Sequence, residues 1–492
     1  MGCAASGPVS VVTPPRPPEV PPPASQDEAL KSSAIDAGID FTGKDSHCTP
    51  HAPPILVTVA QPLTTSFRID ASAGPDVRTR KSGMLDRTTA LIAYQNMPAF
   101  VHKLPKAELH VHLEGTITPQ RVRAIAERNK LTNLDAFDPA KDAVARQGYR
   151  EGAEVLEYCK GENALNAFLT QYNKNSGVYR TAEDFYDVMM DYLKRAAANG
   201  VVRAEIFFDP QTHCYEDVSG CAADPATRDP HGVGKPKLPI KTVLDGLCGA
   251  IDDARKTLGI DAALILSFLQ DRSTEEADAV LEQALPFKDK ILGVDQDNGT
   301  GPFGPGSTSR FKDVYMKAKA NGIRLTAHAG EEEGAKNVAM CLDTLQCERI
   351  NHGVRSLEDA AVVARLAKDR VPLTCCPLSN HRMQLYPRFF CGENPIRPLL
   401  EAGVMVTINS DDPAYFNLGD IDAKCLPCND QTYDGFIASN YLWTARSCGL
   451  TPDECVIIAR NSLEATFVPD ETKAKYVEAL RKYCDGWRPP AV

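Results

Sequence analysis

Two histidines, His110 and His112, stand one residue apart at the end of an apolar run. Side chains on a β-strand alternate between its two faces, so both imidazole rings would point the same way. Such a pair suits a zinc ion, which binds neutral imidazole nitrogens and, in catalytic sites, leaves one position open for water. By itself the pair is a weak indication, because two histidines can also alternate in a strand that binds no metal.

Three later stretches have the same form, an apolar run that ends in acidic, basic or metal-binding side chains. They are LTAHAGEEE (325–333), RINHGV (349–354) and VTINSDDPAYF (406–416). Together with HVHLEGT, the order HxH, HAGE, HG and SDDP resembles the adenosine and adenine deaminases, zinc enzymes that remove the exocyclic amine of a purine. The resemblance extends from about residue 105 to about residue 462, most of the chain.

Short apolar runs alternate with longer helical patterns through the same region. Eight runs are interpreted as strands: 107–112, 201–208, 262–268, 291–295, 323–328, 349–352, 371–376 and 404–409. Most are followed by helix-like segments, at 119–130, 240–258, 274–285, 309–320, 357–367 and 395–402. Strands that alternate with helices predict an α/β fold whose parallel strands close into a (β/α)8 TIM-type barrel.

The barrel predicts that the polar residues of these stretches meet. In this fold the active site lies at the C-terminal ends of the strands, and several strands contribute to it. The side chains at those ends are His110 and His112 in the first strand, His328 in the fifth, His352 in the sixth, and Asp411 and Asp412 after the eighth. We therefore expect all six side chains at one mouth of the barrel.

The resemblance implies one zinc ion per chain with four protein ligands, His110, His112, His328 and Asp411. Relatives of this fold that hold two metal ions usually place a modified lysine at the end of the fourth strand. That strand here reads GVDQD, which contains no lysine and favours a mononuclear site. Asp295 on this strand could orient a ligand histidine through a hydrogen bond, or could be a solvated loop carboxylate.

The resemblance also implies roles for the neighbouring side chains. Zinc lowers the pKa of water enough to supply hydroxide at neutral pH, and that hydroxide would attack C6 of the purine. Glu331 would donate a proton to N1, while His352 would accept a proton from the water or hold the hydroxide in place. Asp412 would hydrogen-bond N7. The structural alternative for Glu331 is a carboxylate that stabilises a helix N-terminus.

Several phrases favour the adenine branch of the family over the adenosine branch. HLEGT carries Glu114 where adenosine deaminases usually have an aspartate that contacts the ribose, and the longer acid could fill the space of the sugar. AEIFFDPQTH (204–213), CPLSN (376–380) and NSDDPAYF (409–416) also resemble the adenine branch. The fourth strand departs from it. Where that branch tends to read DSSE, this chain reads DQDN (295–298), which leaves the contacts to the N3 side of the base open.

The predicted function is zinc-dependent hydrolysis of adenine to hypoxanthine and ammonia, a step of purine salvage. One alternative is a deaminase of adenosine or of N6-substituted purine nucleosides. An alternative of another class is an inactive barrel that binds at a membrane surface. The complete set of metal-binding, acidic and basic residues argues against an inactive barrel, because a non-catalytic protein has no need to retain all of them together.

Composition agrees with an enzyme that acts on a small molecule. The net charge is -11 and no long run of lysine or arginine occurs, which argues against a nucleic-acid partner. No apolar run is long enough to span a membrane. The 16 cysteines are scattered and no apolar signal peptide precedes them, so we expect free thiols in the cytoplasm. The oligomeric state cannot be predicted.

Residues 1–95 are expected to form a disordered, proline-rich arm before a barrel domain at 96–492. The chain opens with MGCAASGPVS, in which Gly2 and Ser6 fit the N-myristoylation pattern and Cys3 could carry a palmitoyl group. The alternative is a chance match. A single myristoyl chain binds membranes only marginally and no polybasic segment is present, so a stable anchor would depend on Cys3.

Two insertions, 214–239 and 299–306, follow the second and fourth strands and would lie at the mouth, as a lid or as surface loops. Cys425 and Cys428 have the spacing of a zinc-binding pair, but no second pair is near, and we expect free thiols. Helices predicted at 433–447, 452–465 and 471–484 would cover the outside and bottom of the barrel. Thr451 and Pro452 have the residue types of an N-cap and a first helical position.

Overall fold

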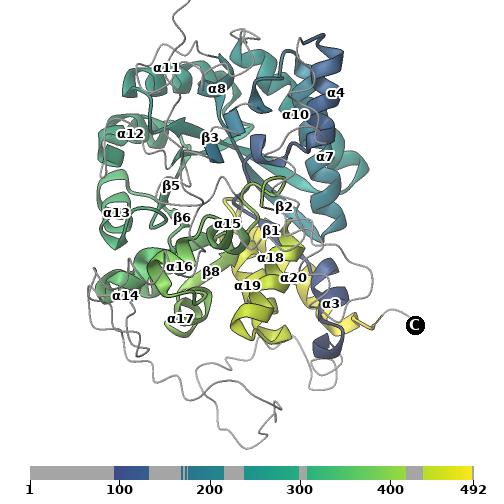
Figure 1. Cartoon of the computed structure of the whole chain (residues 1–492), viewed down its shortest axis with the longest axis vertical. Helices are drawn as coiled ribbons and strands as arrows, with labels where there is room; N and C mark the ends of the chain where they lie inside the picture. Colours follow the sequence, from purple (N-terminus) through teal and green to yellow (C-terminus); the bar gives the residue numbers. More distant parts are fainter. Residues whose placement is uncertain are drawn as a thin grey trace, which may run out of the picture. The chain divides into compact units, whose positions relative to one another are not determined.

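Eight parallel strands form one sheet in which each strand pairs with the next along the chain (Figure 1). The structure is a computed structural model, and it describes residues 93–131, 168–169, 172–173, 175–214, 238–297, 307–416 and 436–489. The strands are β1 (Lys106–Glu108), β2 (Val201–Phe208), β3 (Asp261–Leu269), β4 (Ile291–Asp297), β5 (Arg324–Ala329), β6 (Arg349–His352), β7 (Pro372–Cys375) and β8 (Met405–Ile408). Seven of the eight predicted strands are confirmed with small shifts at their ends, whereas β1 covers only part of the predicted 107–112.

The segment after β1 closes the barrel. Regular pairing of β1 with β2 ends at Glu108, but Val111 forms a bridge with Asp411 and His112 forms one with Phe207. The amide of His112 donates to the carbonyl oxygen of Asp411 at 3.0 Å. The HxH pair therefore lies between β2 and the end of β8, which is the position that the predicted barrel requires. The first regular strand is shorter than predicted because each neighbour offers this segment only an isolated bridge.

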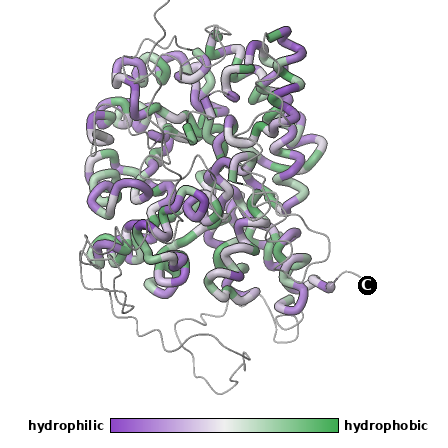
Figure 2. The backbone as a smooth tube through the Cα atoms, viewed as in Figure 1, coloured by the Kyte–Doolittle hydropathy of each residue, from purple (hydrophilic) through white to green (hydrophobic). Residues whose placement is uncertain are grey.

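Helices surround the strands and cover their outer face (Figure 1). They are α4 (Pro119–Arg128), α7 (Ala182–Ala198), α8 (Pro210–Cys214), α10 (Ile240–Thr257), α11 (Thr274–Ala284), α12 (Lys312–Ala320), α13 (Ala335–Met340), α14 (Ala360–Asp369), α15 (Pro377–Arg382), α16 (Leu385–Phe390) and α17 (Ile396–Glu401). Most carry both hydrophobic and hydrophilic residues (Figure 2). The strands are buried on both faces, which is why their sequences are nearly continuous apolar runs.

Short helical turns connect several of these elements. They are η2 (Glu114–Thr116), η5 (Leu285–Phe287), η6 (Ser307–Phe311), η7 (Cys341–Leu345) and η8 (Val354–Glu358). Of these, η2 matters most for the site, because it follows directly after the HxH pair. The chain leaves the extended conformation at Leu113, whose backbone is already helical. The alternation of side chains that holds in a strand therefore stops one residue after His112.

The C-terminal helices pack against the barrel and against one another. They are α18 (Ile437–Cys448), α19 (Pro452–Glu464) and α20 (Asp470–Gly486), and α3 (Met97–Lys103) precedes β1. Helix α19 packs against β1 and β8, and its Ser462 hydroxyl accepts the amide hydrogen of Ala107 at 2.9 Å. Thr451 caps α19 and Pro452 is its first residue, as predicted. These contacts tie the end of the chain to the two strands that close the barrel.

The base of the barrel, at the N-terminal ends of the strands, contains a buried group of charged side chains. Arg349 at the start of β6 donates to Glu205 of β2 at 2.7 Å, and both side chains are fully buried. Arg203 donates to the same carboxylate at 3.3 Å and to Asp261 at 2.8 Å. The guanidinium of Arg349 also lies over the ring of Phe467, 4.2 Å from its centroid. Each buried charge at the base thus has an opposite partner.

Several predicted features lie outside the described residues. They are the N-terminal arm up to residue 92, with Gly2, Cys3 and Ser6, most of the two insertions, and Cys425 with Cys428. The ten cysteines within the described ranges are free thiols. In the same ranges, no helix has the length and apolar character needed to cross a membrane.

Candidate active site

Four side chains meet at the mouth of the barrel with the spacing of metal ligands. Nε2 of His328 lies 3.1 Å from Nε2 of His110 and 3.2 Å from Nε2 of His112. Oδ1 of Asp411 lies 3.2 Å from Nε2 of His110 and 3.4 Å from Nε2 of His112. Ligand atoms at about 2.0–2.1 Å from one zinc ion lie roughly 3–3.5 Å apart, with a further position left for water. The predicted ligand set therefore fits a single zinc-sized ion.

Hydrogen bonds on Nδ1 orient two of the ligand histidines. Nδ1 of His110 lies 3.0 Å from the hydroxyl oxygen of Thr374, and Nδ1 of His328 lies 2.7 Å from Oδ2 of Asp295. Both contacts leave Nε2 directed toward the other ligands. Asp295 is fully buried, so the structure has the orienting arrangement rather than the solvated carboxylate. Burial lowers the pKa of His110 to about 4, which keeps its imidazole in the neutral form that binds metals.

The backbone is strained at two site residues. Asp411 and His352 have φ angles of 64° and 59°, in the left-handed region that non-glycine residues rarely adopt. Each such residue costs of order 1–3 kcal/mol and persists only where the surroundings impose it. Gly115 is part of those surroundings, because a Cβ atom there would lie 1.9 Å from Oδ1 of Asp412. The glycine of HLEGT therefore gives Asp412 the room it needs.

A possible acid and base face each other beside the metal ligands. Nε2 of His352 lies 3.5 Å from Oε2 of Glu331, and Asn380 contacts both residues, at 3.1 Å from Nδ1 of His352 and 3.4 Å from Oε1 of Glu331. Burial, together with the charge of Asp411, raises the pKa of Glu331 to about 8. Burial, together with His110, lowers the pKa of His352. Glu331 is thus protonated and His352 neutral near pH 7.

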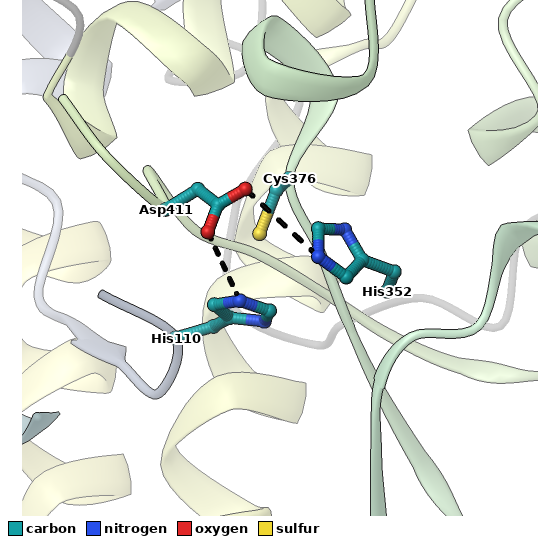
Figure 3. Close-up of side chains that lie close together, drawn as sticks. All are labelled: His110, His352, Cys376 and Asp411. Carbon is teal, nitrogen blue, oxygen red and sulfur yellow. Dashed lines mark ion pairs between the residues drawn. The ribbon is translucent and has the colours of Figure 1, made fainter. Parts of the chain in front are cut away.

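Figure 3 shows that His110, His352 and Cys376 surround the carboxylate of Asp411. Oδ2 of Asp411 lies 3.9 Å from Nε2 of His352, whereas Oδ1 is the oxygen near His110 and His112. Burial raises the pKa of the Cys376 thiol well above its usual range, so its sulfur stays protonated. The thiol lies 3.5 Å from the carbonyl oxygen of Thr374. Asp411 therefore lies between the residues with metal-ligand spacing and the pair of Glu331 and His352.

One cavity is lined by most of the predicted site residues. Its walls contain apolar side chains and many carboxylates, and its lining includes Phe168, Leu169, Tyr172, Asp209, Leu269, Asp271, Asp297, Met383 and Phe416. His112, His328, Glu331, His352, Asp411 and Asp412 line it as well. Burial, and then the charge of Asp411, raises the pKa of Asp412 well above its usual range. The raised pKa favours the neutral form of Asp412, which can donate a hydrogen bond.

Glu114 occupies a different place from the one expected. Its carboxylate is fully buried, does not line the cavity, and lies 2.7 Å from Nε2 of His213. It also accepts the amide hydrogen of Asp209 at 3.2 Å, and the hydroxyl of Tyr172 lies 3.4 Å away. The side chain turns behind the cavity wall because η2 begins immediately after the HxH pair. Direct contact between Glu114 and a substrate stays a prediction.

Comparison with known proteins agrees with this geometry. Residues 105–483 match the adenosine deaminase family. An adenine deaminase from Cupriavidus pinatubonensis is 38% identical over 377 residues, 77% of this chain and 91% of the relative. This chain belongs to the adenosine deaminase family.

Solved structures agree with that assignment. The crystal structure of adenine deaminase from Arthrobacter aurescens is 32% identical with a TM-score of 0.61, covering 78% of this chain and 99% of that one. An amidohydrolase from Burkholderia ambifaria, solved with bound zinc, has the same TM-score of 0.61 at 23% identity, covers 79% of this chain and 92% of its own, and supports the fold. The barrel of this family member is thus shared along nearly the full length of both neighbours.

Sequence reasoning missed four side chains that complete the site of this family member. Thr374 and Asn380 position His110 and His352, while Asp209 and Tyr172 form part of the cavity wall. Asp209 and Asn380 stood inside the phrases AEIFFDPQTH and CPLSN, but no role was assigned to them. The position of Asp209, directly after β2, could have indicated a site residue. Tyr172 lies between two stretches outside the described residues, and its sequence context contains no comparable sign.

Proposed function

We propose that this chain is a hydrolytic deaminase that converts adenine to hypoxanthine and ammonia with one zinc ion per chain. The observation that carries the proposal is the meeting of Glu331 and His352 across the cavity that also exposes His112, His328 and Asp411. A carboxylic acid, a neutral imidazole and a metal-binding group in one buried cavity are the parts that hydrolytic deamination of a purine requires. The names of relatives at 38% identity support adenine as the substrate.

His110, His112, His328 and Asp411 would hold the zinc ion, which supplies hydroxide at neutral pH when bound. Glu331, protonated through its raised pKa, donates its proton to N1 of the purine and so makes C6 open to attack. His352, neutral through burial, accepts a proton from the attacking water. Asn380 lies against the other ring nitrogen, Nδ1; Nε2 is free to accept the proton when Nδ1 carries the ring hydrogen and donates it to the amide oxygen of Asn380. Asp412, as a neutral acid, donates to N7 and holds the base in place.

Steady-state kinetics on adenine and adenosine, with metal analysis of the same samples, test the proposal. We expect about one zinc ion per chain, hypoxanthine and ammonia as products, and a kcat/KM for adenine well above that for adenosine. A kcat/KM for adenosine equal to or above that for adenine would instead identify a nucleoside deaminase. Zinc-loaded protein that deaminates neither compound would support the inactive, membrane-surface alternative.

We propose that Glu114 affects substrate choice indirectly, through the residues to which it is hydrogen-bonded. Its carboxylate bonds His213, the amide of Asp209 and Tyr172, so a shorter acid would loosen the cavity wall rather than open it directly. Glu114→Asp should raise the activity on adenosine relative to adenine. An unchanged ratio of the two kcat/KM values would remove Glu114 from the determinants of substrate choice.

We also propose that the enzyme acts in the cytoplasm, in purine salvage, with acyl chains on Gly2 and Cys3 that attach it to membranes. This part rests on the opening residues MGCAAS alone. Gly2→Ala should move the protein from membrane to soluble fractions without a change in deaminase rate. Wild-type protein from its own cells that is fully soluble and carries no acyl mass would contradict the anchor.

A further inference from the structure

Asp209 has a buried oxygen atom that no described residue satisfies. The residue follows β2 directly, is 1% exposed, and lines the cavity. Its Oδ2 accepts a hydrogen bond from the hydroxyl of Tyr172 at 2.9 Å, whereas its Oδ1 has no hydrogen-bond partner within the described ranges. A buried acceptor without a donor is costly and calls for an explanation such as a bound ligand. In the wall of the cavity, Oδ1 of Asp209 is thus an acceptor that lacks a donor among the described residues.

The surroundings hold Asp209 in place without occupying this oxygen. Its amide donates to Oε1 of Glu114, which is itself bound by His213 at 2.7 Å. Tyr172 connects the two carboxyl groups from the side of Oδ2. Oδ1 accepts a hydrogen bond when Asp209 is ionised, or when a neutral Asp209 carries its proton on Oδ2, toward Tyr172. Glu114, Tyr172 and His213 thus act as positioning residues for Asp209.

The order of the strands matches the order of atoms around the edge of a purine. In the proposed function, N1 lies near Glu331 and His352, after β5 and β6, and N7 lies near Asp412, after β8. Beyond β8, the order of strands around the barrel continues with β1 and β2. Beyond N7, the next nitrogen atom around the purine ring is N9. With the purine in that orientation, N9 is the ring atom assigned to the side of Asp209, whose carboxyl group lies near His112 and Asp297. A free purine base can carry a hydrogen atom on N9, whereas a nucleoside carries its sugar there.

We propose that Asp209 selects the free base by accepting a hydrogen bond from the N9–H group that nucleosides lack. The inference rests on the proposed function, because the orientation of the purine comes from it. It gives a physical reason for substrate choice that involves no direct contact with Glu114. A substituent on N9 removes the donor and leaves Oδ1 unpaired, so N9-substituted purines should bind less well.

Adenine and 9-methyladenine separate this contact from the bulk of a ribose. For the zinc-loaded wild type, we expect a kcat/KM for adenine roughly 10- to 100-fold above that for 9-methyladenine, as for a hydrogen bond to a carboxyl group. Asp209→Ala should lower the kcat/KM for adenine by a similar factor and change that for 9-methyladenine much less. Asp209→Asn keeps an acceptor oxygen and should retain part of the preference. Asp271→Ala, at the same cavity, should change both values by one common factor and leave their ratio unchanged.

Binding of the products provides a readout that needs no turnover. The Kd of hypoxanthine and of 9-methylhypoxanthine, measured by calorimetry, should differ in the wild type and become nearly equal in Asp209→Ala. Equal affinities in the wild type would overturn the inference even if no variant folds. An Asp209→Ala protein that loses both activities by the same factor would also overturn it. So would two metal ions per wild-type chain and one in Asp209→Ala, since His112, Asp209 and Asp297 lie close enough to bind a second cation.

Zinc-loaded wild type that deaminates neither base would contradict the proposed function alone. In that case the ratio of the two Kd values still decides whether Asp209 recognises the unsubstituted ring nitrogen. A preserved binding preference that disappears in Asp209→Ala would support the contact. The failure of the inference and the failure of the proposed function are therefore distinguishable.

Discussion

The two ends of the barrel both bury charged side chains, and they differ in how those charges are balanced. At the base, Glu205 accepts hydrogen bonds from Arg349 and Arg203. Burial alone would raise the pKa of Glu205, but the two guanidinium groups lower it below its usual value. The base therefore holds ionised groups that neutralise one another.

At the mouth, carboxyl groups are crowded together, and the partners of Asp411 and Asp295 are histidines rather than arginines. Burial, reinforced by neighbouring carboxylates, raises the pKa of Asp209, Asp412 and Glu331. No lysine or arginine is found among the described residues that line the cavity. The comparison teaches that a balanced buried pair marks a structural contact, whereas an unbalanced cluster of acids marks the place where a metal ion and a substrate bind.

The largest effect expected at the mouth is that of His328→Ala. The variant loses one of four converging ligand atoms, so zinc and deaminase activity should both be lost while the protein still unfolds cooperatively. Metal analysis and a rate assay measure this, and His381→Ala, on α15 outside the ligand group, is the matched control. Full activity of the variant, or two metal ions per wild-type chain, would contradict a single zinc site.

Glu331→Gln tests the acid at the mouth of the barrel, because it removes the carboxyl proton of Glu331 and leaves the metal-binding residues in place. We expect zinc to stay bound while turnover falls roughly 10²- to 10⁴-fold, as for the loss of a general acid. The neighbouring Glu332→Gln is the control, because Glu332 pairs with Arg388 at 2.9 Å and does not line the cavity. A near-normal rate in Glu331→Gln would transfer the proton donor role to another residue.

Arg349→Ala tests the buried ion pairs at the N-terminal end of the barrel. It leaves Glu205 buried without its main partner and should lower the free energy of unfolding by about 3–5 kcal/mol, with kcat/KM of the folded protein unchanged. Denaturant titration of zinc-loaded protein measures the loss. A carboxyl group with a lowered folded-state pKa stabilises the protein above its unfolded pKa and loses that contribution as the pH falls. Wild type and variant should thus converge in acid, and a gap that is constant with pH would argue against the ion pair.

A smaller effect is expected for Asp295→Ala, which removes the hydrogen bond to Nδ1 of His328. Loss of such a partner typically weakens metal binding by roughly 10- to 100-fold. Competition with a chelator gives the zinc affinity. Ser267→Ala removes only a hydroxyl 3.2 Å from Asp295 and should weaken zinc binding less. Unchanged zinc affinity in Asp295→Ala would mean that packing alone orients His328.

The strands and the ligand positions were predictable because each depends on short stretches of sequence. Buried parallel strands are runs of apolar residues, and a histidine or aspartate at the end of such a run must reach the C-terminal mouth. The boundaries of β2 and β6 agree with the predicted ones at both ends. The turn after the HxH pair was not predictable in this way; it places Glu114 beside His213, and contact of Glu114 with a substrate stays a prediction.

The sequence by itself determined the barrel and predicted which side chains meet at its mouth. Only the tertiary structure decided how the other buried charges are paired. Arg349 meets Glu205 across 144 positions of sequence, and Ser410 meets Glu108 across 302. Closure of the barrel brings such residues together, and the local sequence around either residue does not predict its partner. The same closure leaves Asp209 with one unpaired oxygen within the described structure, because the partners of a buried side chain are set by the strands that surround it.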